Sequence, residues 1–169
     1  MVPMRLRQFE LREIIGQGGM GTVFRSFDVM LEREVAVKLM KPELANDKEA
    51  ITSFLREAKA AAGLNHSNII HIYSFDESEG SRYLVMELAN NGSLDSWIES
   101  GQIVPELNVL DIGIKIASAL DCANKHGLLH RDVKPANILF NNEGEPKLVD
   151  FGLAIQGDDT EVGESVIWG

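Results

Sequence analysis

The 169-residue chain has little cysteine, no long apolar run and a deficit of positive charge. Because Cys122 is its one cysteine, no disulfide can form within the chain, and we expect a reducing compartment, the cytoplasm. No uninterrupted apolar stretch approaches the roughly 20 residues of a membrane-spanning helix. Residues 1–10 contain two arginines without an apolar segment behind them, so we expect no signal peptide there.

Acidic residues outnumber basic ones, 26 Asp and Glu against 16 Lys and Arg, which gives a formal net charge of −10 at pH 7. Nucleic acids and anionic membrane surfaces attract basic faces, so we expect neither as a partner. With 44% hydrophobic and 25% charged residues, the composition is that of a globular protein large enough to bury a core.

The hydrophobic pattern changes from mainly strands to mainly helices near residue 90. Alternating or β-branched apolar residues predict short strands at 11–15, 22–28, 34–40, 69–75, 82–88, 137–140 and 147–149. Apolar residues at three- and four-residue spacing predict helices over 48–64, 94–99 and 105–126. We therefore expect an α+β fold with two lobes, residues 1–89 and 90–169, joined by a hinge at Asn90-Asn91-Gly92.

A glycine-rich motif, Gly16-Gln17-Gly18-Gly19-Met20-Gly21-Thr22-Val23, lies between the first two of these predicted strands. Its glycines would let backbone N–H groups approach phosphate oxygens without interference from a Cβ atom. A dinucleotide-binding turn uses the same first six positions but needs a helix directly after them, whereas a strand pattern follows here. A strand–loop–strand cover over phosphates fits better, although the motif alone is equally typical of a mobile glycine hairpin.

Two charged residues follow this motif. Lys38 ends an apolar strand and could reach back under the glycine loop, although a lysine at a strand end is usually a solvated surface charge. Glu57 lies beside the apolar stripe of the predicted helix 48–64, where an unpaired buried carboxylate would be costly. Lys38 is therefore its expected partner, and a solvated helix face is the alternative.

The motif His130-Arg131-Asp132-Val133-Lys134-Pro135-Ala136-Asn137 is far more specific. Asp132 can accept a hydroxyl proton, Lys134 can neutralise a phosphoryl group, and the Asn137 carbonyl can bind a divalent cation. Asp150-Phe151-Gly152 follows a short apolar strand, a position that suits a carboxylate ligand of Mg²⁺. Each motif alone has simpler explanations, but their occurrence together and in this order makes coincidence negligible.

From about Phe9 onward the chain resembles the eukaryotic-type (Hanks-type) serine/threonine protein kinases, and its glycine loop resembles that of bacterial members. The resemblance implies a protein-kinase-like bilobal fold with a complete antiparallel-sheet N-lobe and a partial helical C-lobe. It also implies ATP-dependent phosphorylation of protein serine or threonine hydroxyls. Lys134 points to these hydroxyls, because tyrosine kinases usually carry another residue there.

The resemblance also assigns roles to individual residues. The turn Gly16–Gly21 would cover the phosphates of ATP, which Lys38 would hold while it pairs with Glu57. Asp132 would be the catalytic base. Adenine would lie between Val23, Ala36 and Leu139, beside Met86 and the backbone of Glu87 and Ala89. Asn137 and Asp150 would hold Mg²⁺. Activity would depend on an activation loop whose phosphorylated Thr160 or Ser165 pairs with Arg131, although plain solvated loop residues are the simpler interpretation of both.

The sequence ends at Gly169, before the Ala-Pro-Glu motif of this family. We therefore expect a kinase domain truncated within its activation segment, which alone phosphorylates poorly. The predicted helix 105–126 carries Leu110, Ile114, Ala117 and Leu120 on one face, and an apolar face of this helix should stay exposed. Two alternatives are a catalytically inactive nucleotide-binding interaction module and a kinase fragment completed by a partner chain. A small-molecule phosphotransferase of related fold is disfavoured by the full His-Arg-Asp-x-Lys-Pro set.

Overall fold

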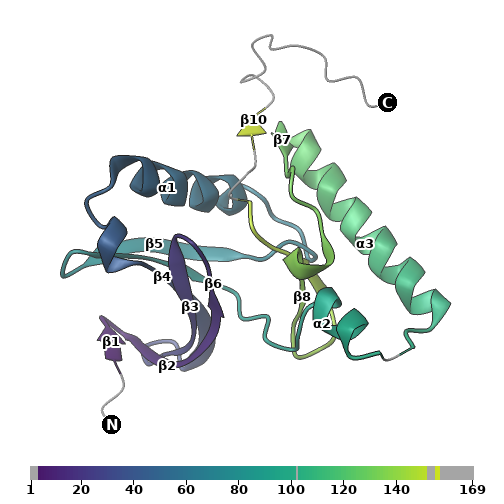
Figure 1. The fold of residues 1–169 in the computed structure, drawn as a ribbon, viewed down its shortest axis with the longest axis horizontal. Helices are drawn as coiled ribbons and strands as arrows, with labels where there is room; N and C mark the ends of the chain where they lie inside the picture. Colours follow the sequence, from purple (N-terminus) through teal and green to yellow (C-terminus); the bar gives the residue numbers. More distant parts are fainter. Residues whose placement is uncertain (1–3, 102, 152–154, 157–169) are drawn as a thin grey trace.

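The computed structural model describes residues 4–101 and 103–151 and the backbone of residues 155 and 156. A curled antiparallel sheet forms one side of the molecule, and helices with short strands form the other (Figure 1). The sheet has the strand order β1-β2-β3-β4-β6-β5. Its strands are β1 (Met4–Leu6), β2 (Phe9–Gln17), β3 (Gly21–Asp28), β4 (Arg33–Met40), β5 (Ile72–Ser78) and β6 (Ser81–Met86).

The curl of the sheet brings its first hairpin to its far edge strand. Arg7, in the turn between β1 and β2, donates hydrogen bonds to the Asp76 carboxylate (3.0 Å) and the Glu77 carbonyl (2.8 Å) of β5. Apolar side chains of five strands fill the space inside. The buried members of this core are Leu6, Phe9, Leu11, Val35, Val37, Tyr83 and Val85. Strand β1 was not predicted, because three residues are too few for a recognisable alternation.

Tyr83 is a weak point of this core. Its side chain is fully buried, and its hydroxyl has no hydrogen-bond partner within the described part of the chain. Burial raises the pKa of Tyr83, and the nearby Asp76 carboxylate adds to the rise. An unsatisfied buried hydroxyl costs folding free energy that an apolar ring of the same shape does not.

We expect Tyr83→Phe to raise the free energy of unfolding by about 1 kcal/mol, as measured by urea denaturation. The edge-to-face packing of this ring on Phe9, with centroids 6.2 Å apart, would be kept. Tyr73→Phe is the matched control, because Tyr73 is 39% exposed and its hydroxyl can reach water. A Tyr83→Phe protein less stable than the wild type would contradict the prediction.

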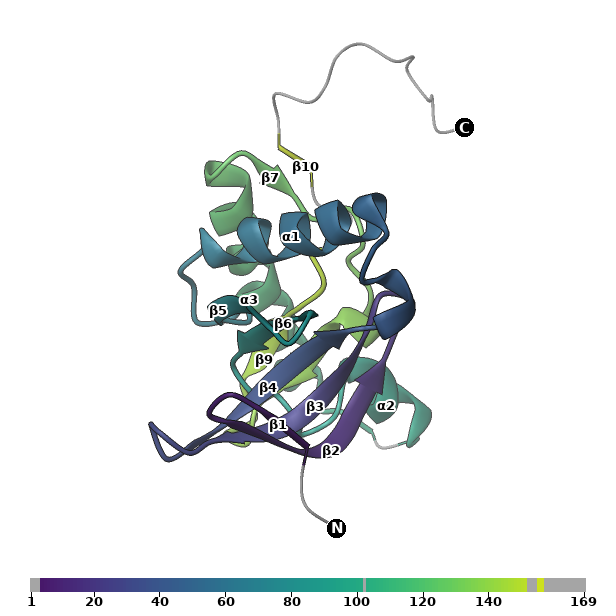
Figure 2. The same ribbon diagram turned by 90° about the vertical axis from the view of Figure 1, so that its left-hand side faces the viewer.

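Helix α1 (Lys48–Ala62) crosses one side of the sheet (Figure 2). The Asp47 carboxylate caps it by accepting hydrogen bonds from the backbone N–H groups of Glu49 and Ala50. Phe54 and Ala58 pack on Met40 of β4 and Leu84 of β6. This packing fixes the helix, and with it Glu57, against the strand that carries Lys38.

The second part of the molecule consists of helices and short strand pairs. It contains α2 (Leu94–Glu99), α3 (Glu106–Lys125), β7 (Leu128–Leu129), β8 (Ile138–Phe140), β9 (Pro146–Leu148) and β10 (Ile155–Gln156). The structure also describes two 3₁₀ turns: η1 (Pro42–Leu44) lies between β4 and α1, and η2 (Pro135–Asn137) lies directly before β8. Strand β8 pairs with β9, and β10 pairs with β7. No helix in the described ranges combines the length and apolar character needed to cross a membrane.

The segment after α1 belongs to the core of this second part. Leu148 of β9 donates its backbone N–H to the Asn68 carbonyl (2.8 Å), and Ile70 donates to the Leu148 carbonyl (3.0 Å). Because these residues bond to β9, strand β5 begins at Ile72 and not at 69 as predicted. The two parts are therefore joined at two places, here and at the segment that follows β6.

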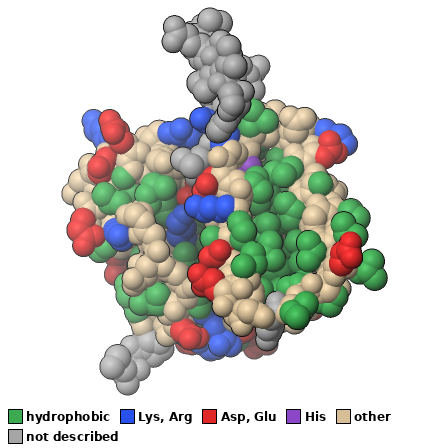
Figure 3. All heavy atoms as spheres, turned by 45° about the vertical axis from the view of Figure 1, so that its right-hand side comes forward, with side chains coloured by type: hydrophobic (Ala, Val, Ile, Leu, Met, Phe, Trp, Pro, Cys, Tyr) green, Lys and Arg blue, Asp and Glu red, His purple; other side chains and the backbone are tan. Residues whose placement is uncertain are grey.

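Helix α3 is apolar on two sides. Its buried side, Ile112, Ile116, Ala119 and Ala123, packs in the second core. Of the stripe noted in the sequence, Leu110 and Ile114 face outward, 55% and 70% exposed, whereas Leu120 is half-buried against the second core. Figure 3 shows hydrophobic side chains gathered on this side of the molecule. The expected exposed apolar face is thus confirmed, and the partner chain predicted to cover it stays a prediction.

Candidate active site

A cleft of about 780 Å³ separates the sheet from the β8–β9 hairpin. Almost every residue singled out in the sequence lines it. These residues are Gly16, Gln17, Gly18, Gly19, Met20, Gly21, Val23, Ala36, Lys38, Glu57, Met86, Glu87, Ala89, Asn137, Leu139 and Asp150. Asp132 and Lys134 lie beside the cleft, and Asp132 is tied to it through Asn137.

The glycine motif forms the turn between β2 and β3 and covers one end of the cleft. Gly18 donates its backbone N–H to the Gly21 carbonyl at 2.9 Å, which makes the turn tight. A Cβ atom on Gly21 would lie only 2.6 Å from the Leu39 carbonyl oxygen, so no other residue fits there without movement of the backbone. Strand β3 follows the turn directly, as predicted, where a dinucleotide-binding fold would begin a helix.

The expected pair of Lys38 and Glu57 is confirmed. The Lys38 ammonium nitrogen lies 2.7 Å from both carboxylate oxygens of Glu57. Their side chains are only 17% and 11% exposed, so the charges are largely withdrawn from water. Strand β4 places Lys38 opposite Val23, at the glycine turn, while α1 supplies Glu57. A positive group is thus held at the end of the cleft that the glycine turn covers.

The loop before β8 brings Asp132 and Asn137 together. The Asn137 amide nitrogen donates to the Asp132 carbonyl (2.8 Å) and to the Asp132 carboxylate (3.1 Å). Because the nitrogen is used in this way, the amide oxygen is the atom left for a cation. The Lys134 ammonium lies 3.4 Å from the Asp132 carboxylate. One carboxylate, one amide oxygen and one ammonium therefore converge at the edge of the cleft.

His130 supports this loop from behind. Its Nδ1 accepts the backbone N–H of Asp132 (3.2 Å), so its Nε2 is the nitrogen that donates to the Val149 carbonyl (2.8 Å). The imidazole meets the buried ring of Phe151 edge-on, with centroids 4.7 Å apart. These contacts bring Asp150, between Val149 and Phe151, to the loop that holds Asn137. Gly152, Thr160 and Ser165 lie outside the described residues.

Asp150 and Asn137 suit a magnesium site. Mg²⁺ in nucleotide sites usually takes one or two protein oxygens and completes its shell with phosphates and water. Both side chains line the cleft, and the Asp150 backbone has φ 65°, a left-handed conformation that aspartate tolerates better than most residues. The described residues contain no cluster of three or more His, Cys, Asp or Glu side chains that could bind a metal without such help.

The segment after β6 forms the other end of the cleft. The Glu87 backbone N–H donates to the His71 carbonyl (2.8 Å), while the Glu87 carbonyl accepts no hydrogen bond from the residues that the structure describes, and Glu87 lines the cleft. The Ala89 N–H makes no hydrogen bond with any residue that the structure describes. This backbone therefore offers an acceptor and a donor side by side to a flat polar ligand.

Sequence reasoning missed several residues at this end. Ile15, Ile70 and Ile72 add apolar lining, and Ser93 and Ser96 line the wall toward α2. Ser93 also caps α2, within a capping box with Ser96. Lys147, whose ammonium lies 2.6 Å from the Glu87 carboxylate, was placed on a predicted strand but given no role. Nothing in the local sequence pairs two residues so far apart along the chain.

Comparison with known proteins agrees with this arrangement. The protein kinase domain family matches residues 9–167. The chain is 37% identical over 155 residues to serine/threonine-protein kinase PrkC of Bacillus subtilis, covering 92% of this chain and 24% of PrkC. It is 41% identical over 152 residues to serine/threonine-protein kinase PknA of Mycobacterium tuberculosis, covering 87% of this chain and 35% of PknA.

The same region resembles serine/threonine-protein kinase PknB of Mycobacterium leprae, with 37% identity over 151 residues, 87% of this chain and 24% of PknB. The chain thus spans about a quarter to a third of the length of these relatives. The family match, in contrast, extends over nearly all of its residues and includes every motif that lines the cleft. The chain therefore belongs to the protein kinase domain family.

Proposed function

We propose that this domain transfers the terminal phosphoryl group of ATP to a serine or threonine hydroxyl of a protein substrate. The observation that carries the proposal is the grouping of the buried Lys38–Glu57 ion pair with Asp132, Asn137 and Asp150 around one cleft. The relatives are named serine/threonine-protein kinases, which supports the same substrate class. We also propose residues 1–89 and 90–169 as its two lobes, and the cytoplasm as its location.

We propose one orientation for the nucleotide in the cleft. Adenine would lie between Val23 and Ala36 on the sheet side and Leu139 on the β8–β9 side, with Met86 behind it. Its amino group can donate to the Glu87 carbonyl, and its ring nitrogen can accept from the Ala89 N–H. The phosphates would then lie under the glycine turn and next to the Lys38 ammonium.

The chemistry follows from the groups at the phosphate end. Mg²⁺, held by Asn137 and Asp150, would neutralise part of the phosphate charge. As the hydroxyl oxygen bonds to the terminal phosphorus, the bond from that phosphorus to its bridging oxygen breaks and ADP leaves. The Asp132 carboxylate takes the hydroxyl proton, and Lys134 stabilises negative charge on the transferring group.

Nucleotide binding is tested first, by thermal unfolding of the 169-residue chain. Mg·ATP should raise the midpoint in a saturable way, because a ligand at about 100 times its Kd adds about 2.7 kcal/mol to stability. Mg·GTP should raise it less, since its ring presents a carbonyl to the Glu87 carbonyl. The absence of any shift at millimolar Mg·ATP would sink the proposal.

A further inference from the structure

A second ion pair that is largely buried from water borders the cleft, at the end opposite Lys38. The Lys147 side chain is 10% exposed and that of Glu87 is 20% exposed, with 2.6 Å between the ammonium and the carboxylate. A lysine so far from water is costly unless it is paired. The pair joins β9 to the residue directly after β6, and so bridges the two parts of the molecule.

Lys147 lies in the β8–β9 hairpin, which forms the side of the cleft opposite the sheet, here called its floor. In the β8–β9 ladder Lys147 stands directly opposite Leu139. Directly opposed residues of an antiparallel pair project to the same face, and Leu139 lines the cleft. Lys147 is therefore anchored beside the floor on which adenine would rest.

Glu87 connects the same ion pair to the sheet side of the cleft, here called its roof. It follows Met86, which pairs with Ala36 of β4, a residue of the roof. The second carboxylate oxygen of Glu87 accepts the His71 backbone N–H (3.2 Å), and its own backbone N–H donates to the His71 carbonyl (2.8 Å). Glu87 is thus held by side chain and backbone, and the carbonyl offered to adenine is held with it.

We infer that Lys147 is a positioning residue for nucleotide binding. Through Glu87 it holds residues 87–89, here called the hinge segment, at a fixed distance from Leu139, and so sets the width of the gap that adenine enters. It touches neither the phosphates nor the hydroxyl substrate, so it acts on affinity and leaves the transfer step unchanged. This inference rests on the proposed function, because it names a residue that serves the same cleft.

Replacing the lysine tests the inference. Lys147→Met leaves the largely buried Glu87 carboxylate without its counter-ion. We expect the hinge segment to shift so that water reaches this carboxylate. We expect the Kd for Mg·ADP, measured by titration calorimetry on the full chain, to rise about tenfold, the effect of one charged contact. The phosphoryl-transfer rate at saturating ATP should stay within about twofold, as for a contact made equally in ground and transition states.

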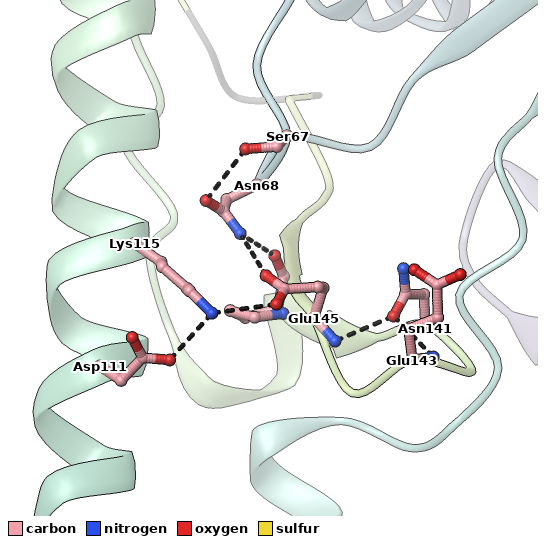
Figure 4. Close-up of polar contacts among 8 residues, drawn as sticks. Ser67, Asn68, Asp111, Lys115, Asn141, Glu143 and Glu145 are labelled. Atoms are coloured by element: carbon pink, nitrogen blue, oxygen red, sulfur yellow. Dashed lines mark hydrogen bonds and ion pairs between the residues drawn. The ribbon is translucent and has the colours of Figure 1, made fainter.

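The turn of the same hairpin offers a matched control (Figure 4). Lys115 of α3 lies 3.1 Å from the Glu145 carboxylate and 2.9 Å from that of Asp111. The hydrogen bonds that its ammonium donates to Asp111, and to a lesser degree to Glu145, raise the pKa of Lys115. This lysine also ties the hairpin to the rest of the protein, but away from the cleft. Lys115→Met should therefore leave the Kd for Mg·ADP unchanged.

The double variant Glu87→Met/Lys147→Met separates positioning from stability. With both charges gone no carboxylate is left unpaired, so the thermal midpoint should recover toward that of the wild type. Affinity should stay low, because the hinge segment has still lost its anchor. A purely structural role predicts recovery of both.

Each possible outcome either supports the inference or overturns it. Wild-type affinity in Lys147→Met, an equal loss in Lys115→Met, or recovered affinity in the double variant overturns the inference and leaves the proposed function intact. A wild-type chain that does not bind Mg·ADP overturns both.

Discussion

Replacing Asp132 with asparagine will lower the phosphoryl-transfer rate at saturating ATP by about 10²- to 10⁴-fold, the usual contribution of a positioned proton acceptor. The amide has the shape of the carboxylate, so the hydrogen bond from Asn137 to the Asp132 carbonyl can persist. What is lost is the group that takes the hydroxyl proton. Nucleotide affinity should stay within about twofold of the wild type, because Asp132 lies outside the lining of the cleft.

The assay is transfer of labelled phosphate to a generic serine/threonine substrate, with Mg·ADP affinity measured in parallel. Asp121→Asn is the matched control, since Asp121 is an exposed aspartate of α3 that forms an ion pair with Lys125, four residues further along the same helix. If Asp132→Asn keeps more than a tenth of the wild-type rate, the proton-acceptor role is wrong. A wild type that binds nucleotide without transferring phosphate would instead favour the catalytically inactive module.

The parts of the site that could be predicted are those whose geometry is local. The glycine turn is held by a hydrogen bond from the Gly18 N–H to the Gly21 carbonyl, three residues apart, at 2.9 Å. Asp132 and Asn137 belong to one short loop, so a hydrogen bond between them needs little help from the rest of the fold. The pairing of Lys38 with Glu57 was also predictable, since one apolar strand and one amphipathic helix present both charges toward the same core.

What could not be predicted depends on packing between distant segments. Helix α3 is apolar on two sides, and periodicity alone cannot tell that Ile112 and Ile116 are buried while Ile114 is exposed. The contact of Lys147 with Glu87 arises only when the β8–β9 hairpin packs beneath the segment after β6. In the same way, Ile70 leaves the predicted strand 69–75 because it donates its backbone N–H to the Leu148 carbonyl of β9.

The buried pair of Lys38 and Glu57 should behave as one functional unit. Lys38→Met removes the cation at the phosphate end, and Glu57→Gln leaves that cation without the carboxylate that aims it. Each single variant should lower kcat/KM by about 10²-fold, the usual loss for one preorganised charged group in an active site. Each replacement side chain retains much of the volume of the original, but each single change leaves one buried charge unpaired, so the rates are compared below the unfolding midpoint of both variants.

The double variant Lys38→Met/Glu57→Gln distinguishes a unit from two independent contributions. If the two groups contributed independently, their effects would multiply and the double variant would lose about 10⁴-fold in kcat/KM. If they act only together, the double variant should lose about 10²-fold in kcat/KM, as either single variant does. The half-exposed pair of Arg25 and Glu34 on β3 and β4 is the control, since its side chains are 37% and 32% exposed and lie outside the cleft lining. Arg25→Met and Glu34→Gln should each change kcat/KM less than about twofold. Full additivity at Lys38 and Glu57 would mean that the carboxylate does not act through the lysine, and the proposed role of Glu57 would have to be given up.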